Sequence, residues 1–143
     1  MKSALWLPAL ALFACFSAAA GDAPLSPPKA PADAAAYIIE PADGAVVTNP
    51  VTVVFGLKGM GVAPAGMEHA DTGHFHLLVD TGLPPQGAPI PKDEQHLHFG
   101  GGQTQTVLTL KPGKHTLQLL MGDFAHMSFD PPVISKLITI TVK

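Results

Sequence analysis

The sequence contains a single cysteine, Cys15, and no arginine. One cysteine cannot form a disulfide within the chain, and Cys15 lies in the N-terminal apolar segment, so a cysteine nucleophile in the folded domain is also excluded. Basic residues are sparse: apart from Lys2, seven lysines stand against eleven acidic residues, a net charge of about −4. Because nucleic-acid binding requires a basic surface that displaces counterions, nucleic acid is not an expected partner.

Helical periodicity and serine nucleophiles are also missing. No segment after the N-terminal region repeats its apolar residues at helical spacing. The only serines in the C-terminal part of the chain are Ser128 and Ser135, and neither lies in a Gly-x-Ser-x-Gly turn. Asp93 and Glu94 are adjacent, an arrangement that does not favour a converging acid and base. The sequence therefore favours a binding protein over an enzyme without deciding between them.

The first twenty residues have the order of a secretory signal peptide. Lys2 precedes an apolar run over residues 4–16, and small residues follow up to Ala20. The run is too short to span a bilayer as a helix. We expect residues 1–20 to be a signal peptide cleaved after Ala20, which predicts a periplasmic or secreted protein. The alternative is lipoprotein processing at Cys15, and only this alternative would attach the chain to a membrane.

Residues 21–36 read GDAPLSPPKAPADAAA, a composition that predicts a disordered or partly extended Pro/Ala-rich linker. Beyond it, short β-rich runs alternate with Gly, Pro, Asn and Asp. This punctuation predicts that residues 37–143 form a single all-β domain, an immunoglobulin-like antiparallel β-sandwich. We expect strands over residues 37–39, 51–55, 74–80, 96–98, 104–110, 115–121 and 133–142.

The predicted strands are joined by turns and by three long loops, over residues 58–72, 81–94 and 122–132. Long ordered loops are more often functional than short ones. Residues 111–114, with proline at the second position, read as a tight turn, so the strand after it should return antiparallel beside the strand before it. The glycines of residues 100–102 lie between strands with no helix following, and we interpret them as a bend rather than a phosphate-binding loop.

Two His-x-His triplets are the most informative motif. In a strand, alternate side chains share one face, so each triplet presents two imidazoles to the same side. In the first triplet the histidines should face away from the apolar row of Phe75, Leu77 and Val79. Neutral imidazoles are ligands for Cu(II) and Zn(II). The predicted metal ligands are His74, His76, His96 and His98, with His126 and His69 as reserve donors.

Other residues refine this hypothesis. Methionines lie in or beside the loops, and thioether combined with imidazole suits copper better than zinc. One of them, Met121, continues the apolar row of its strand and is expected in the core. Ligating imidazoles usually donate their second N–H to an acceptor. Asp80, Asp123 and His115 are the residues expected in such a supporting role.

The sequence thus predicts an exported transition-metal binding protein that takes copper first and zinc second, as a carrier, buffer or sensor. Its partners would be the metal ion and a periplasmic or envelope protein. A second hypothesis is a non-catalytic envelope interaction or adhesion module. Under this hypothesis the histidines are structural and hydrogen-bond to one another, to acidic residues and to loop carbonyls.

Several blocks in the same order resemble one family of small exported bacterial domains, the domain of unknown function DUF 4399. The resemblance runs from Ile38 to the C-terminus and implies a compact periplasmic β domain without an established activity. The family motif often has a further histidine near Phe129, which this chain lacks. The blocks that carry the resemblance are Gly73-His74-Phe75-His76-Leu77-Leu78-Val79-Asp80, His98-Phe99-Gly100-Gly101-Gly102-Gln103-Thr104, Pro112-Gly113-Lys114-His115-Thr116-Leu117-Gln118-Leu119, Gly122-Asp123, His126 and Pro131-Pro132-Val133.

Locally, His74-Phe75-His76 also resembles the strand copper ligands of copper-zinc superoxide dismutases. The bridging histidine and zinc loop of that family have no counterpart in this chain. The likeness supports metal binding through strand histidines and does not imply dismutase chemistry.

Overall fold

The computed structural model describes residues 26–143, so the expected signal peptide and Cys15 lie outside the described residues. These residues form β-strands joined by loops and contain no helix, hence none long and apolar enough to cross a membrane. The all-β prediction is confirmed. The strands are β1 (Ala35–Glu40), β2 (Val46–Val47), β3 (Val51–Lys58), β4 (Gly61–Val62), β5 (Thr72–Val79), β6 (His96–His98), β7 (Gln105–Leu108), β8 (Gly113–Gly122) and β9 (Ile138–Val142).

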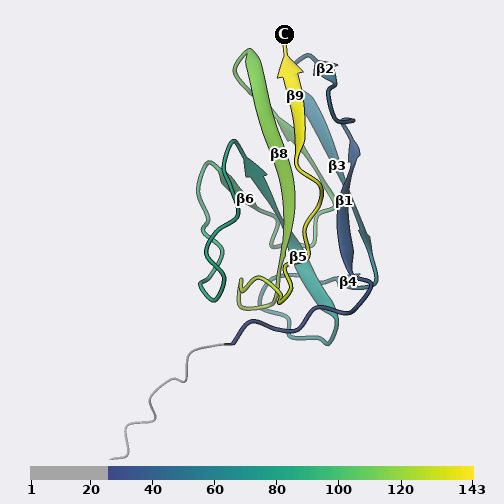
Figure 1. The fold of residues 1–143 in the computed structure, drawn as a ribbon, viewed down its shortest axis with the longest axis vertical. Helices are drawn as coiled ribbons and strands as arrows, with labels where there is room; N and C mark the ends of the chain where they lie inside the picture. The colour runs from purple at the N-terminus through teal and green to yellow at the C-terminus, as the bar shows by residue number, and fades with distance from the viewer. Residues whose placement is uncertain (1–25) are drawn as a thin grey trace, which may run out of the picture.

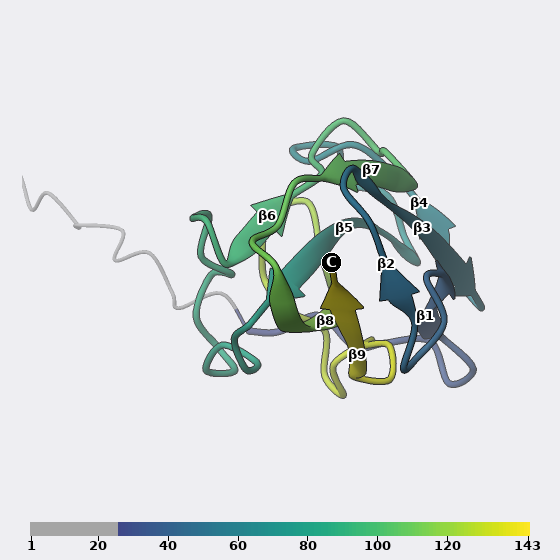
Figure 2. The same ribbon diagram turned by 90° about the horizontal axis from the view of Figure 1, so that it is seen from above.

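The strands form two sheets (Figure 1). The smaller sheet has the antiparallel order β1-β3-β7, and the larger has the order β2-β9-β8-β5-β4, with β6 also paired to β5. Seen from above, β1, β3 and β7 lie on one side of the molecule and β5, β8 and β9 on the other (Figure 2). The pairs β2–β9 and β4–β5 are parallel, so the larger sheet is mixed rather than purely antiparallel as predicted.

One hydrophobic core lies between the two sheets. Phe55 of the smaller sheet packs against Phe75 of β5 and against Phe99, with ring centroids 5.1 Å and 4.9 Å apart. Burying each such side chain contributes about 1.5–3 kcal/mol. The inward rows predicted from strand alternation, including Met121, are confirmed as core. They are Val51, Val53 and Phe55 in β3, Phe75, Leu77 and Val79 in β5, Leu117, Leu119 and Met121 in β8, and Ile138, Ile140 and Val142 in β9.

The opposite face of the larger sheet is covered as well. Leu78 of β5 and Leu120 of β8 form a second apolar cluster with Ile90, from the loop before β6, and with Ile134, from the segment before β9. Every residue of β5 from Gly73 to Val79 is consequently buried. The histidines of β5 therefore face away from the main core, as predicted, but they face a second, loop-covered interior rather than water.

The predicted hairpin around residues 111–114 is wrong. β7 pairs with β3 in the smaller sheet, whereas β8 pairs with β5 and β9 in the larger sheet, so the turn carries the chain from one sheet to the other. The Asn49 side chain provides the physical reason. Its amide donates to the Leu110 carbonyl at 2.7 Å and its oxygen accepts from Leu110 N at 3.0 Å, so the backbone groups that would continue a hairpin ladder are already bonded.

Part of the segment expected as a linker is folded. Asp130 N donates to the Pro28 carbonyl at 2.8 Å and Ala30 N donates to the Asp130 carbonyl at 3.1 Å. β1 starts at Ala35, and Ala36 is buried in the main core. The expected boundary between residues 36 and 37 thus falls inside a strand. Alanine fits both a flexible spacer and a tightly packed strand, so composition alone did not locate this boundary.

Candidate metal centre

Four imidazole rings converge on the loop-covered face of the larger sheet. His74 and His76 project from β5, His98 projects from β6, and His126 lies in the loop after β8. The centroids of the six ring pairs are between 4.8 and 6.0 Å apart. His74 Nε2 is 3.0 Å from His76 Nε2, and His98 Nε2 is 2.9 Å from His126 Nε2. The nitrogens therefore point toward one another.

Strand register places the three sheet histidines side by side. His76 is opposite His98 in the antiparallel β5–β6 pair, and His74 lies two residues before His76 on the same face. His74 and His76 are fully buried, whereas His98 is partly exposed. The sheet thus holds three imidazoles at fixed positions, two of them beneath the loops.

Two glycines make room for these rings. A Cβ atom on Gly100 would lie 2.2 Å from His98 Cε1, and a Cβ atom on Gly122 would lie 3.0 Å from His76 Nε2. The sequence identified a glycine bend at residues 100–102 but assigned neither glycine to the site. Their signal in the sequence is position: Gly100 follows the second triplet by two residues, and Gly122 ends the strand that pairs with the first triplet.

The backbone of His126 is held by Asp123. The Asp123 carboxylate Oδ1 accepts from Ala125 N at 2.9 Å and from Met127 N at 2.8 Å, and the Asp123 carbonyl accepts from His126 N at 3.0 Å. His126 has a φ of 64°, in the left-handed region that non-glycine residues adopt at a cost, and Ile90 N donates to its carbonyl at 2.7 Å. Asp123 therefore positions a backbone turn, whereas the sequence had suggested contact with an imidazole.

Burial keeps the sheet histidines uncharged at neutral pH. Burial, reinforced by His126 and His98, lowers the pKa of His74 to about 4. Burial and the neighbouring histidines lower the pKa of His76 to about 3. The pKa of His98 is also lowered, chiefly by burial and then by His126 and Lys92. Neutral imidazole is the form that binds metal, so protons do not compete for these nitrogens near pH 7.

Two buried polar atoms in this cluster have no protein partner. His74 Nδ1 and His76 Nδ1 are buried and make no hydrogen bond. Each ring therefore uses only its inner nitrogen, the one that faces the other imidazoles. An unsatisfied buried polar group costs about 1–3 kcal/mol.

The spacing of the nitrogens suits a transition metal. One nitrogen from each of His74, His76 and His98 lies within 4.8 Å of the other two. With bonds of about 2.0 Å, ligand nitrogens stand about 2.8 Å apart at a right angle and about 3.3 Å apart in a tetrahedron. The two measured Nε2 separations, 3.0 and 2.9 Å, fall within this interval. These three histidines could hold a metal ion, and His126 adjoins them.

The structure does not bring His96 and His69 into the cluster. His96 lies opposite Leu78, one step along the sheet from His98, and its Nδ1 donates to Asp93 Oδ1 at 2.8 Å. His69 is exposed in the loop before β5, where its Nδ1 donates to the Ala70 carbonyl at 3.0 Å. Alternation in the sequence shows which face a residue occupies, but not whether its side chain reaches the same point along the strand.

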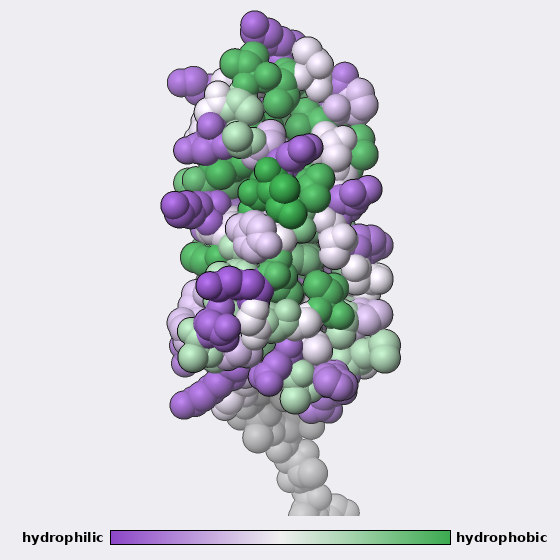
Figure 3. Space-filling view, turned by 90° about the vertical axis from the view of Figure 1, so that its right-hand side faces the viewer, coloured by the Kyte–Doolittle hydropathy of each residue, from purple (hydrophilic) through white to green (hydrophobic). Residues whose placement is uncertain are grey.

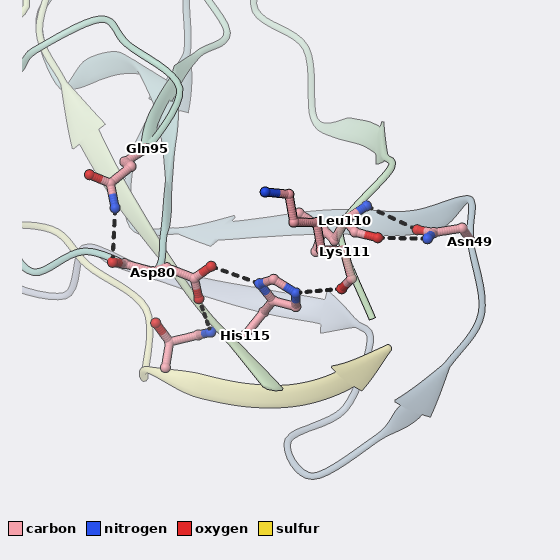
Figure 4. A network of polar contacts seen from close by, with 7 residues as sticks. Asn49, Asp80, Gln95, Leu110, Lys111 and His115 are labelled. Atoms are coloured by element: carbon pink, nitrogen blue, oxygen red, sulfur yellow. Dashed lines mark hydrogen bonds and ion pairs between the residues drawn. The ribbon is translucent and has the colours of Figure 1, made fainter. Parts of the chain in front are cut away.

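Asp80 and His115 form a separate polar contact after the far end of β5 (Figure 4). His115 Nδ1 donates to Asp80 Oδ2 at 2.7 Å and His115 Nε2 donates to the Lys111 carbonyl at 2.8 Å. These two acceptors favour the charged form of His115, in which both ring nitrogens donate, and the hydrogen bond to the Asp80 carboxylate raises its pKa. Asp80 and His115 thus bind each other and connect β5 to β8 instead of supporting the four-histidine cluster.

Two features that the sequence suggested contribute less to the metal site: the sulfur atoms of the methionines and the position of Phe129. Met121 lies opposite Phe75 on the core-facing side of the sheet, away from the histidines, and Met60 packs against the same core. Phe129, near which the resemblance implies a further histidine, is buried in the main core. A Cβ atom on Gly73 would lie 3.2 Å from its ring.

Comparison with known proteins agrees with the resemblance seen in the motifs. The comparisons with curated proteins and with solved structures give no match. A family described as Domain of unknown function (DUF4399) matches residues 53–143. This range covers most of the chain and includes all four clustered histidines, His74, His76, His98 and His126. The chain therefore belongs to the DUF4399 family.

Proposed function

We propose that this protein binds a transition metal, copper first and zinc second, through His74, His76, His98 and His126, and acts as a carrier, buffer or sensor. The convergence of four rings from two strands and a loop supports this proposal. The lowered pKa values of His74 and His76 support it further, because they keep these nitrogens available at neutral pH.

The observation that carries the proposal is the burial of His74 and His76 with both Nδ1 atoms unpartnered. Histidines that serve only to stabilise a fold are expected to satisfy both nitrogens, since each unsatisfied group costs about 1–3 kcal/mol. Apolar side chains would fill the same space without this cost. A metal ion bound at the inner nitrogens offsets the cost, and therefore gives a reason for keeping two such imidazoles buried.

The imidazole nitrogens of the cluster favour copper, whereas the sequence argument for copper rested on methionine sulfur. At least two of the methionines pack in the core, so the copper preference no longer depends on their sulfur atoms. The cluster itself offers neutral nitrogen donors. Nitrogen sites bind Cu(II) more tightly than Zn(II) when geometry permits both. We therefore keep copper as the first metal and zinc as the second.

The surroundings of the ligands favour a carrier or buffer over a permanent structural site. In tightly held metal sites, the second nitrogen of each histidine usually donates to a carboxylate or carbonyl, and loss of that partner lowers metal affinity about 10–100-fold. His74 and His76 lack such partners. A metal held chiefly by packed imidazoles is more readily exchanged, as delivery or buffering requires.

The proposal is tested by titrating the purified, untagged protein with Cu(II), Cu(I) and Zn(II) against a competing chelator. The matched variant carries His74→Leu and His76→Leu, because leucine fills the buried space without unsatisfied polar atoms. We expect one tightly bound equivalent in the wild type and its loss in the variant. The metal-free variant should be at least as stable as the metal-free wild type.

The opposite pattern would favour structural histidines. If the wild type binds no metal more tightly than the chelator, and the double variant melts at a lower temperature whether or not metal is present, the proposal is wrong. The leucine variant keeps this test informative, because a packed apolar pair is less disruptive than two alanine cavities.

A second candidate function is the envelope interaction module. Tyr37, Ile39 and Val107 are 47%, 52% and 60% exposed. Figure 3 shows apolar side chains gathered on the side of the molecule that carries β1 and β3. Such a surface suits a protein partner. Under this function the four histidines would hold the loops against the sheet, and their replacement would lower the melting temperature whether or not metal is present.

Two further proposals concern the class of fold and the location. The two sheets packed around one core support an immunoglobulin-like β-sandwich. The charged and apolar pattern of residues 1–20 supports export to the periplasm or beyond, with lipidation of Cys15 as the alternative. Labelling the N-terminus of the exported protein distinguishes the two, because only lipidation leaves Cys15 as the first residue.

A further inference from the structure

The candidate metal centre brings no negative charge to an ion. Within residues 26–143, the group of nitrogens from His74, His76 and His98 includes no carboxylate oxygen. The charged or polar neighbours that influence these three rings are other histidines and Lys92. A divalent ion bound by neutral imidazoles keeps both positive charges, and partial burial makes such a charge costly.

Two carboxylates near the ligands in sequence, those of Asp93 and Asp123, are engaged elsewhere. Asp93 Oδ1 accepts from His96 Nδ1 at 2.8 Å and from the backbone N of His96 and Gln95, both at 2.9 Å. Asp123 Oδ1 accepts from two backbone N–H groups of its own loop. Both acids therefore maintain local turns. Because the converging group within residues 26–143 contains no carboxylate, a ligand from solution can compensate the metal charge.

The four rings define the direction from which such a ligand arrives. His74 and His76 are fully buried, whereas His98 and His126 are partly exposed. The separation between His76 and His126, 6.0 Å between centroids, is the longest of the six. His126 thus lies at the outer edge of the three sheet histidines. Solvent reaches the cluster on the side of His98 and His126.

The chain segment that contains Lys92 passes this edge. Ile90 N donates to the His126 carbonyl at 2.7 Å, so the segment before β6 crosses directly beside His126. Lys92 follows Ile90 by two residues and is exposed. Its positive charge acts on His98, which is consistent with an ammonium group near the entrance. A metal ion and an ammonium group on one side of a site attract an anion together.

We propose that the metal centre takes a small inorganic anion as an exchangeable ligand on the side formed by His98, His126 and Lys92. The inference rests on the proposed metal-binding function and adds the chemical class of a second ligand. The anion coordinates the metal through its own lone pair and partly neutralises the ion. The ammonium group of Lys92 strengthens the attraction from outside. No bond within the protein changes.

Azide is a suitable probe, because its coordination to Cu(II) gives a new charge-transfer absorption and alters the electron paramagnetic resonance spectrum. The protein is first loaded with one equivalent of Cu(II) and then titrated with sodium azide at constant ionic strength. We expect a saturable response with one azide per copper, while copper stays bound.

The Lys92→Gln variant should bind azide about threefold more weakly, a modest effect because the lysine is solvent-exposed. Lys111→Gln, which removes a lysine beside His115, is the control and should leave azide affinity unchanged.

The outcomes separate the two proposals. If the protein takes up no Cu(II), the copper assignment in the proposed function fails, and this inference fails with it. If copper binds but azide changes neither spectrum, or azide only strips copper from the protein, this inference alone is overturned. If the two lysine variants weaken azide binding equally, the assignment of Lys92 is wrong, because a general change of net charge then explains the effect.

Discussion

His98 Nε2 lies 2.9 Å from His126 Nε2, although the two residues are separated by 28 positions and by strands β7 and β8. One ring is fixed on a strand, whereas the other depends on a loop. This contact joins the β6 edge of the larger sheet to the loop after β8. His126 is also a nitrogen donor that belongs to neither His-x-His triplet. The cluster therefore has two supports, the sheet and the loop.

Gly100→Ala should weaken metal binding. The new Cβ would lie 2.2 Å from His98 Cε1, so the ring must leave its position. We expect metal affinity to fall about tenfold or more, as for loss of a group that orients a ligand. Chelator competition measures the change. Gly82→Ala is the control, because a Cβ on Gly82 meets no atom within 4 Å. Equal effects of the two substitutions would contradict the role assigned to Gly100.

Asp123→Ala should loosen the His126 loop. The carboxylate accepts from Ala125 N and Met127 N, and its removal leaves two backbone donors unpaired at a cost of about 1–3 kcal/mol. We expect lower stability by denaturant unfolding and about tenfold weaker metal binding. Asp123→Asn retains an oxygen acceptor and should behave close to the wild type. A less stable Asp123→Ala protein with unchanged metal affinity would show that the loop does not position a ligand.

The metal-free protein should lose stability as the pH falls. In the folded state the pKa values of His74 and His76 are about 4 and about 3, whereas the ordinary histidine value is 6.5. Below pH 6.5 the histidines of the unfolded chain therefore bind protons while His74 and His76 of the folded chain stay neutral, and the free energy of unfolding decreases down to about pH 3. Urea unfolding at several pH values should show a smaller decrease in the His74→Leu/His76→Leu variant. An equal decrease in both proteins would argue against buried neutral imidazoles.

The contact between His115 and Asp80 should have the opposite pH dependence. The pKa of His115 is raised, so its stabilising effect is fully present below the ordinary value of 6.5 and disappears as the pH rises through the folded-state value. Compared with His115→Gln, the wild type should be more stable by about 0.5–1 kcal/mol at about pH 5.5, and the difference should shrink by about pH 8.5. A difference that grows with pH would contradict the charged contact.

Much of the fold follows from strand alternation. The rows Phe75-Leu77-Val79 and Ile138-Ile140-Val142 face the main core because hydrophobic residues at every second position require one buried face. Alternation also placed His74 and His76 on the opposite face. It could not show that the loop containing Ile90 covers that face, because this packing joins segments whose contact leaves no periodic signal.

Long-range contacts explain what the sequence did not reveal. The two histidines of the second triplet look equivalent, yet His98 lies opposite His76 while His96 lies opposite Leu78 and binds Asp93. The turn after β7 read as a hairpin because its residues suit one. The bonds from Asn49 to Leu110 that separate the two sheets span 61 positions. Neither pairing leaves a local signal in the sequence.

The difference between His98 and His96 provides the most direct test of the metal centre. Chelator competition with Cu(II) should be measured for the wild type, His98→Ala and His96→Ala. Because His98 belongs to the converging group and His96 does not, we expect affinity to fall at least about 100-fold in His98→Ala and less than about threefold in His96→Ala. Equal losses in the two variants, or no loss in His98→Ala, would contradict the assignment of the metal to this cluster.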